Sequence, residues 1–149
     1  MSATTTLILG GGFGGISAAN WLRRLLGADH QIIVIDKTSE IHVGAGKTWI
    51  MLGERTYAQI SQSRTALLDA GVEFVETNVL GLDLSNRAVS TEHETLHWDH
   101  LVIALGADLN PSTVPGLVEA AHTFYTVEGA QHLRAALERF SGEIGRAHV

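Results

Sequence analysis

Apolar runs and amphipathic segments alternate along this chain of 149 residues, and their spacing predicts the secondary structure. Residues 4–9 are β-branched and aliphatic, which predicts a buried strand. Residues 31–36 form a second run that is almost continuously apolar, as in a parallel strand covered on both faces. Between them, apolar residues recur at helical spacing from Ile16 to Leu26, and Gly27 is a natural stop. This order of strand, helix and strand predicts a βαβ unit with a parallel sheet.

The middle of the chain mixes helical and strand-like spacing. Residues 38–56 form a long connection in which residues 48–52 predict a short helix. Residues 57–70 predict a longer helix, and residues 72–77 predict a third strand. Three short alternating segments follow between residues 79 and 98, and the turn residues that separate them predict an antiparallel meander.

The last third of the chain contains another apolar run, an irregular segment and an amphipathic segment. Residues 99–107 predict another buried strand, and residues 108–117, which contain both prolines, predict irregular structure. Residues 126–140 predict a helix with Thr126 as its N-cap. The apolar face of this helix would consist of Ala130, Leu133, Leu137 and Phe140.

Five glycines stand within the stretch LILGGGFGG, at the end of the first predicted strand. The spacing Gly10-x-Gly12-x-x-Gly15 between a strand and a helix is the fingerprint of dinucleotide-binding folds. In this motif Gly10 allows the tight turn, Gly12 lets a pyrophosphate approach the backbone, and Gly15 lets the helix pack closely on the strand. Gly11 and Gly14 are then extra glycines that keep the loop free of side chains.

An acidic residue ends the second strand, about 20 residues beyond the glycines, where the fingerprint requires one. The carboxylate of Asp36 is expected to accept hydrogen bonds from the ribose hydroxyls of an adenosine. It would repel a 2′-phosphate, which disfavours NADP, although Lys37 beside it offsets part of this charge. The complete constellation favours a dinucleotide site over a glycine-rich turn without a ligand. FAD and NAD both remain open, since both bind to such a loop.

Charge and composition exclude several other classes of function. The net charge of −6 and the isoelectric point of about 5.7 argue against a nucleic-acid surface. The chain has no cysteine, which excludes disulfides, zinc–thiolate sites and CxxC redox pairs within it. Its eight histidines are scattered, and we expect no metal site. The apolar runs are too short to span a bilayer and the N-terminus is not a secretory signal, which together predict a cytoplasmic protein.

Over residues 4–142 the chain resembles the N-terminal part of the two-dinucleotide-domain flavoproteins, the pyridine nucleotide-disulfide oxidoreductase superfamily. The fingerprint starts within ten residues of Met1, and a meander stands where an NAD-only domain would have another helix. The segment LVIALGADLNPSTVPG is similar to the superfamily's second FAD signature, an apolar strand that ends in A-T-G. Leu105 departs from this signature because it stands at the threonine position, where a hydroxyl contact would be lost.

The resemblance implies FAD as the cofactor and an α/β fold. We expect a Rossmann-like parallel sheet with flanking helices plus a three-stranded antiparallel β-meander, which form the incomplete N-terminal part of an FAD-binding domain at residues 1–142. The expected cofactor-binding residues are Gly10, Gly12, Phe13, Gly14, Gly15, Asp36, Lys37, Lys47, Val79, Ala104, Leu105 and Gly106.

Within the superfamily, the segment GAGKTWIMLGER is similar to the group of sulfide:quinone oxidoreductases, flavocytochrome c sulfide dehydrogenases and alternative NADH dehydrogenases. By this resemblance Lys47 approaches the flavin or its phosphates; the alternative is a lysine in a solvated loop. The group implies electron transfer from NAD(P)H or sulfide through FAD to an acceptor such as quinone. In the longer protein it also implies peripheral contact with the inner face of a membrane.

The identity of the electron donor depends on cysteines. The sulfide-oxidising members use cysteines that are missing here, which favours NAD(P)H, and no catalytic residue is identified within this chain. We expect the isolated chain to be inactive. The alternative from a different class is a non-enzymatic, NAD-sensing Rossmann module.

Residues 143–149 read EIGRAHV, which resembles the translation of a common sequencing adapter, GAG ATC GGA AGA GCA CAC GTC. We expect this segment to be read-through on a truncated fragment whose natural sequence continues after Gly142. The genomic locus tests this expectation. A further apolar strand after Gly142 would support it, and a stop codon after Val149 would contradict it.

Overall fold

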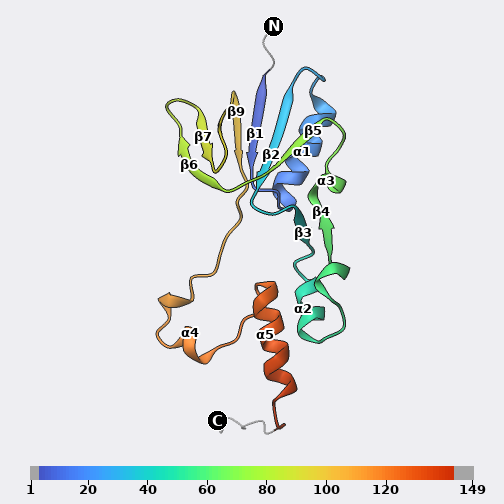
Figure 1. Ribbon diagram of the computed structural model, residues 1–149, viewed down its shortest axis with the longest axis vertical. Coiled ribbons are helices and arrows are strands. Elements are labelled where there is room, and N and C mark those ends of the chain that lie inside the picture. Colours follow the sequence, from blue (N-terminus) through green and yellow to red (C-terminus); the bar gives the residue numbers. More distant parts are fainter. Residues whose placement is uncertain (1–3, 143–149) are drawn as a thin grey trace. The chain divides into compact units, whose positions relative to one another are not determined.

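The computed structural model describes residues 4–142, which form two compact units (Figure 1). The first unit contains residues 4–41 and 62–107, and the second contains residues 42–61 and 108–142. The interpretation of residues 143–149 as an adapter-derived tail lies outside the described residues and stays a prediction.

The first unit is built on a four-stranded parallel sheet with the strand order β5-β2-β1-β9. Its strands are β1 (Thr5–Leu9), β2 (Gln31–Asp36), β5 (Val72–Glu76) and β9 (His100–Ile103). In the register, Leu9 lies opposite both Ile35 and Ile103, and Asp36 lies opposite Glu76. The carboxyl ends of all four strands therefore meet at one edge of the sheet. The four strands predicted from the apolar runs are confirmed.

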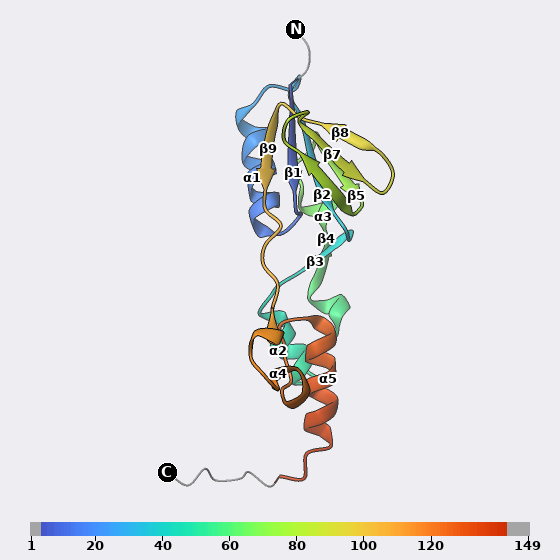
Figure 2. The same cartoon turned by 90° about the vertical axis from the view of Figure 1, so that its left-hand side faces the viewer.

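Helix α1 (Phe13–Leu25) covers one face of this sheet, as the helical spacing predicts (Figure 2). Ile8 of β1 faces the helix and packs in a cluster with Ala19, Ile32 and Val34. Because successive side chains of a strand point to opposite faces, the neighbours of Ile8 face the other side of the sheet. The continuous apolar run of β1 thus supplies two cores at once.

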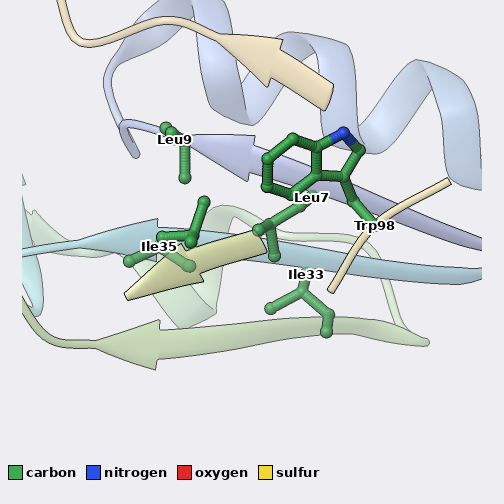
Figure 3. Packing of buried hydrophobic residues seen from close by; sticks show 6 residues of the cluster. Leu7, Leu9, Ile33, Ile35 and Trp98 are labelled. Atoms are coloured by element: carbon green, nitrogen blue, oxygen red, sulfur yellow. The ribbon is translucent and has the colours of Figure 1, made fainter. Parts of the chain in front are cut away.

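The predicted meander covers that other face (Figure 2). It consists of the antiparallel strands β6 (Val79–Asp83), β7 (Ala88–Thr91) and β8 (Thr95–His97). Trp98 lies in the cluster between the meander and the sheet, together with Leu7, Leu9, Ile33 and Ile35 (Figure 3). The meander therefore closes the second core, and the unit has three layers of helix, parallel sheet and antiparallel sheet.

The second unit is helical and has a small core of Ile50, Ile60 and Ala130. Its elements are α2 (Gly46–Met51), η1 (Tyr57–Gln59), η2 (Pro111–Thr113), α4 (Leu117–Ala120) and α5 (Val127–Glu138). Thr126 caps α5 as predicted, since its hydroxyl oxygen accepts a hydrogen bond from the Gly129 N–H at 3.0 Å. The predicted apolar face is correct at Ala130, whereas Leu137 and Phe140 are exposed.

The helix predicted over residues 57–70 is wrong. The structure has instead the turn η1, then β4 (Ser61–Ser63), which pairs with β3 (Glu40–His42), and the single turn α3 (Arg64–Leu67). Ile60 and Arg64 are buried at a spacing of four residues, which imitates the apolar face of a helix. Serine side chains compete with the helical backbone for hydrogen bonds, and pairing with β3 decides the conformation here.

None of the helices within residues 4–142 has the length and hydropathy that a membrane span requires.

Candidate functional site

The glycine loop joins β1 to α1 and leaves no room for side chains at two of its positions. Gly10 has a φ of +103°, and a Cβ atom there would lie 2.3 Å from the carbonyl oxygen of Ala104. A Cβ atom at Gly15 would lie 1.8 Å from the carbonyl oxygen of Gly10. Gly10 therefore permits the tight turn and Gly15 the close packing of helix on strand, as the fingerprint predicts.

Gly12 serves a different purpose. A Cβ atom there would meet no protein atom within 4 Å, because the backbone at Gly12 borders an open cavity of about 660 Å³. The first backbone hydrogen bond of α1 runs from the Ile16 N–H to the Gly12 carbonyl at 3.0 Å. The N–H groups of the preceding turn have no partner within the helix and suit an anion.

Four segments that follow β1, β2, β5 and β9 line this cavity. All the residues predicted to bind the cofactor lie there except Gly15 and Lys47. They are Gly10, Gly12, Phe13, Gly14, Asp36, Lys37, Val79, Ala104, Leu105 and Gly106. Residues predicted from four separate stretches of the chain thus line one cavity, because parallel strands bring their carboxyl ends to one edge; their role in binding a cofactor stays a prediction.

The two exceptions lie in different places. Gly15 is buried beneath the loop, where its role is packing. Lys47 belongs to α2 in the second unit. Its ammonium group donates to the Tyr125 carbonyl and lies 4.9 Å from the centre of the Tyr125 ring. A role of Lys47 toward a flavin stays a prediction.

Asp36 ends β2 and points into a network of donors. Its Oδ2 accepts the Gly11 N–H at 2.8 Å, and its Oδ1 accepts the Thr38 N–H at 3.2 Å. The same Oδ1 lies 3.2 Å from a guanidinium nitrogen of Arg64. A carboxylate offers about four acceptor positions, so Oδ2 keeps one for a ligand. The carboxylate is thus held in place before any ribose hydroxyl arrives.

Arg64 is the main site residue that the sequence analysis missed. Its side chain is 8% exposed, and its Nε donates to the Gly11 carbonyl at 2.8 Å. Its Nη1 donates to the hydroxyl of Thr38 at 2.8 Å and to the carbonyls of Thr38 and Glu40. One side chain therefore fastens the glycine loop, the end of β2 and the segment after it. The available signal in the sequence was the position of Arg64, which falls at helical spacing from the apolar residues Ile60 and Leu67.

Arg64 also changes the electrostatics expected at Asp36. A lone carboxylate would strongly repel a 2′-phosphate, but this carboxylate forms a partly buried ion pair with a guanidinium group. The positive partner offsets much of the negative field that faces the cavity. The exclusion of NADP is therefore weaker than the sequence alone implies.

Few titratable side chains line the cavity among the described residues. The titratable residues that line the cavity are Asp36, Lys37 and Arg64, and two of these are paired with each other. Thr77 and Asn78, which follow β5, complete the wall and were not singled out from the sequence. Backbone N–H groups at a helix start, a fixed carboxylate and a lean loop are the elements that hold a dinucleotide.

Comparison with known proteins agrees with this geometry. The family model described as pyridine nucleotide-disulphide oxidoreductase matches residues 4–148. An NADH dehydrogenase-like protein of Mycobacterium tuberculosis is 30% identical over 145 residues, which cover 93% of this chain and 36% of that protein. The type II NADH:quinone oxidoreductase of Staphylococcus haemolyticus is 26% identical over 136 residues, which cover 89% of this chain and 33% of that protein.

A solved structure shows the same fold. The sulfide:quinone oxidoreductase of Aquifex aeolicus superimposes with a TM-score of 0.80 at 26% identity, covering 91% of this chain and 32% of that one. The chain thus spans about a third of the length of the relatives that it matches. The family match over almost the whole chain and the geometry of the loop lead to one conclusion: this chain belongs to the pyridine nucleotide-disulphide oxidoreductase family.

Proposed function

We propose that this chain is the FAD-binding part of an oxidoreductase that passes electrons from NAD(P)H, or from sulfide, through FAD to an acceptor such as a quinone. The single observation that carries the proposal is the cavity at Gly12, where backbone without a side chain borders open space at the start of α1. The names of the relatives support a redox function with NADH or sulfide as donor and quinone as acceptor.

The residues present fit a dinucleotide with an adenosine half. The pyrophosphate would occupy the space in front of Gly12, where the free N–H groups of the first turn and the positive end of α1 favour negative charge. The ribose would meet the remaining acceptor position of Asp36 Oδ2. A side chain at Gly12 would fill this cradle, which explains why the position has none.

These contacts separate the role of the cofactor from the role of the residues that hold it. When bound, the flavin supplies the electron-transfer chemistry. The residues described here bind and orient it: the glycine loop holds the phosphates, and Asp36, fixed by Arg64, holds the adenosine end. The segment 104–106 after β9 would lie along the cofactor from the other side of the cavity. Donor and acceptor sites, membrane contact and cytoplasmic location are properties to be tested in a longer protein.

Cofactor identity is the decisive test on the chain itself. Titration of FAD, followed by quenching of its fluorescence, should show saturable binding, and NADH should bind far more weakly. Gly12→Val should abolish FAD binding and leave the chain folded, because its side chain points into empty space and valine at this N-cap costs only about 1 kcal/mol. Ala28→Val, on an exposed turn residue outside the cavity lining, serves as the control with added bulk and should bind FAD normally.

The opposite result would support a different class of protein. Saturable binding of NADH together with no binding of FAD would identify an NAD-sensing Rossmann module and overturn the proposal. Equal FAD affinity in Gly12→Val and in the unchanged chain would show that the cavity is not the binding site.

A further inference from the structure

The side chain of Thr77 stands out among the residues that line the cavity. It directly follows β5 and is only 4% exposed. Its N–H donates to the Asp36 carbonyl at 3.0 Å, which holds the backbone at the end of β2 and β5. Within residues 4–142, however, its hydroxyl oxygen is buried and has no hydrogen-bond partner.

An unpartnered buried hydroxyl destabilises a folded protein, because the group loses its hydrogen bonds to water and gains none. Valine has nearly the same shape as threonine and would fill the same space without this cost. A threonine at this position therefore calls for a partner that is not part of these residues.

The position of Thr77 indicates which part of a dinucleotide could be that partner. The glycine loop follows β1, Asp36 ends β2, and Thr77 follows β5, which is the next strand outward in the order β5-β2-β1-β9. With the phosphates at the end of β1 and the ribose at Asp36 at the end of β2, the outer edge of the ribose and the adenine would lie at the end of β5. Both offer hydrogen-bonding atoms to a hydroxyl.

Rotation of the side chain would change the direction in which the hydroxyl points. Threonine side chains occupy staggered rotamers, and rotation about χ1 exchanges the hydroxyl with the methyl group or the hydrogen. Thr77 is one of the residues that line the cavity, and rotation about χ1 requires no movement of the backbone. The free energy lost by the unpartnered hydroxyl is recovered when the ligand accepts or donates the missing bond.

We propose that the Thr77 hydroxyl is a hydrogen-bonding contact for the adenosine half of the bound dinucleotide, an inference that rests on the proposed function. The test is Thr77→Val, with binding measured by titration of FAD and of ADP, and stability measured by urea unfolding without ligand. The valine variant should be at least as stable as the unchanged chain. Its affinity for both FAD and ADP should fall about 5- to 30-fold, the effect of one lost hydrogen bond.

Two further variants separate this role from a structural one. Thr77→Ser keeps the hydroxyl and should bind within about threefold of the unchanged chain. Thr91→Val is the matched control, since Thr91 is also buried but its hydroxyl donates to the Glu94 carbonyl at 2.9 Å. That variant should lose stability and keep its affinity for ADP.

Several outcomes would overturn the inference. Unchanged affinity in Thr77→Val would do so, as would a loss of stability or of folding like that of Thr91→Val, because the hydroxyl would then have a partner in the protein. A loss of affinity for FAD without a loss for ADP would place the contact outside the adenosine half. If the unchanged chain binds neither ligand, the proposed function fails first and this inference fails with it.

Discussion

At the scale of single residues, the five glycines of the loop are not equivalent. The sequence suggests that Gly11 and Gly14 are both extra, but the structure separates them. A Cβ atom at Gly11 would lie 2.6 Å from Cδ and 2.7 Å from Nε of Arg64, whereas one at Gly14 would only touch the Ala104 Cβ at 3.9 Å. Gly11 is therefore required by Arg64, which packs beneath the loop and was not among the predicted site residues.

This difference predicts opposite effects on stability. Gly11→Ala should lower the free energy of unfolding by about 1–3 kcal/mol, because the methyl group overpacks a buried site. Gly14→Ala should raise it by up to about 1 kcal/mol, since alanine favours the first turn of α1. Urea unfolding of both variants without ligand measures this. Equal effects of the two substitutions would show that Arg64 yields to the methyl group.

Arg64 should be worth more to the fold than any exposed ion pair. Arg64→Met leaves the carboxylate of Asp36 without its charged partner and removes one donor from each of the Gly11, Thr38 and Glu40 carbonyls. We expect a loss of about 3–5 kcal/mol in the free energy of unfolding. Arg64→Lys should recover part of it, and adding Asp36→Asn to Arg64→Met should cost less than the separate effects together. A loss below about 1 kcal/mol in Arg64→Met would refute the role of this pair.

At the scale of elements, the sequence predicted what a repeating pattern determines. The four parallel strands, α1, the meander and the capped start of α5 are each specified by local spacing or by a turn, and each is present. The helix predicted over residues 57–70 is absent because Ile60 and Arg64, which are buried at helical spacing, flank the strand β4 that pairs with β3. Arg64 was missed for the same reason: its partners at residues 11, 36 and 38 come from sheet topology and not from its neighbours in sequence.

The turn between β6 and β7 offers a test by pH. Asp83 accepts hydrogen bonds from the backbone and side chain of Asn86 and from the Ser85 N–H, and these bonds hold its pKa below the usual value of 3.8. Because the pKa is lowered in the folded state, the stabilisation is complete above pH 3.8 and is lost as the pH falls through the folded value. Asp83→Asn should therefore melt at a lower temperature at pH 7, and the difference should shrink at pH 3. Ser85→Ala retains the backbone donor and should behave like the unchanged chain; a difference that does not depend on pH would contradict the role of the charge.

At the scale of the whole molecule, the parallel sheet of the described residues has two edge strands, β5 and β9. Among residues 4–142, β9 pairs only with β1, so its outer edge has unpaired N–H and C=O groups. Ile103 on this strand is 59% exposed, and Leu105 just after it is exposed as well. An exposed apolar edge strand is a template for pairing with another chain. The site therefore lies next to an edge strand with exposed apolar side chains.

We expect the isolated chain to associate through β9 at micromolar concentrations and above, as unpaired strand edges do. Ile103→Lys places a charge on this edge, which opposes pairing, so the variant should remain monomeric at concentrations where the unchanged chain forms dimers or larger species. Leu25→Lys is the matched control, because Leu25 is 74% exposed on α1 and adds the same charge away from the edge. Size-exclusion chromatography with light scattering measures the mass of each variant over a dilution series. If Leu25→Lys suppresses association as well as Ile103→Lys does, net charge rather than the strand edge governs it; if the unchanged chain stays monomeric throughout, the edge is protected by its own geometry.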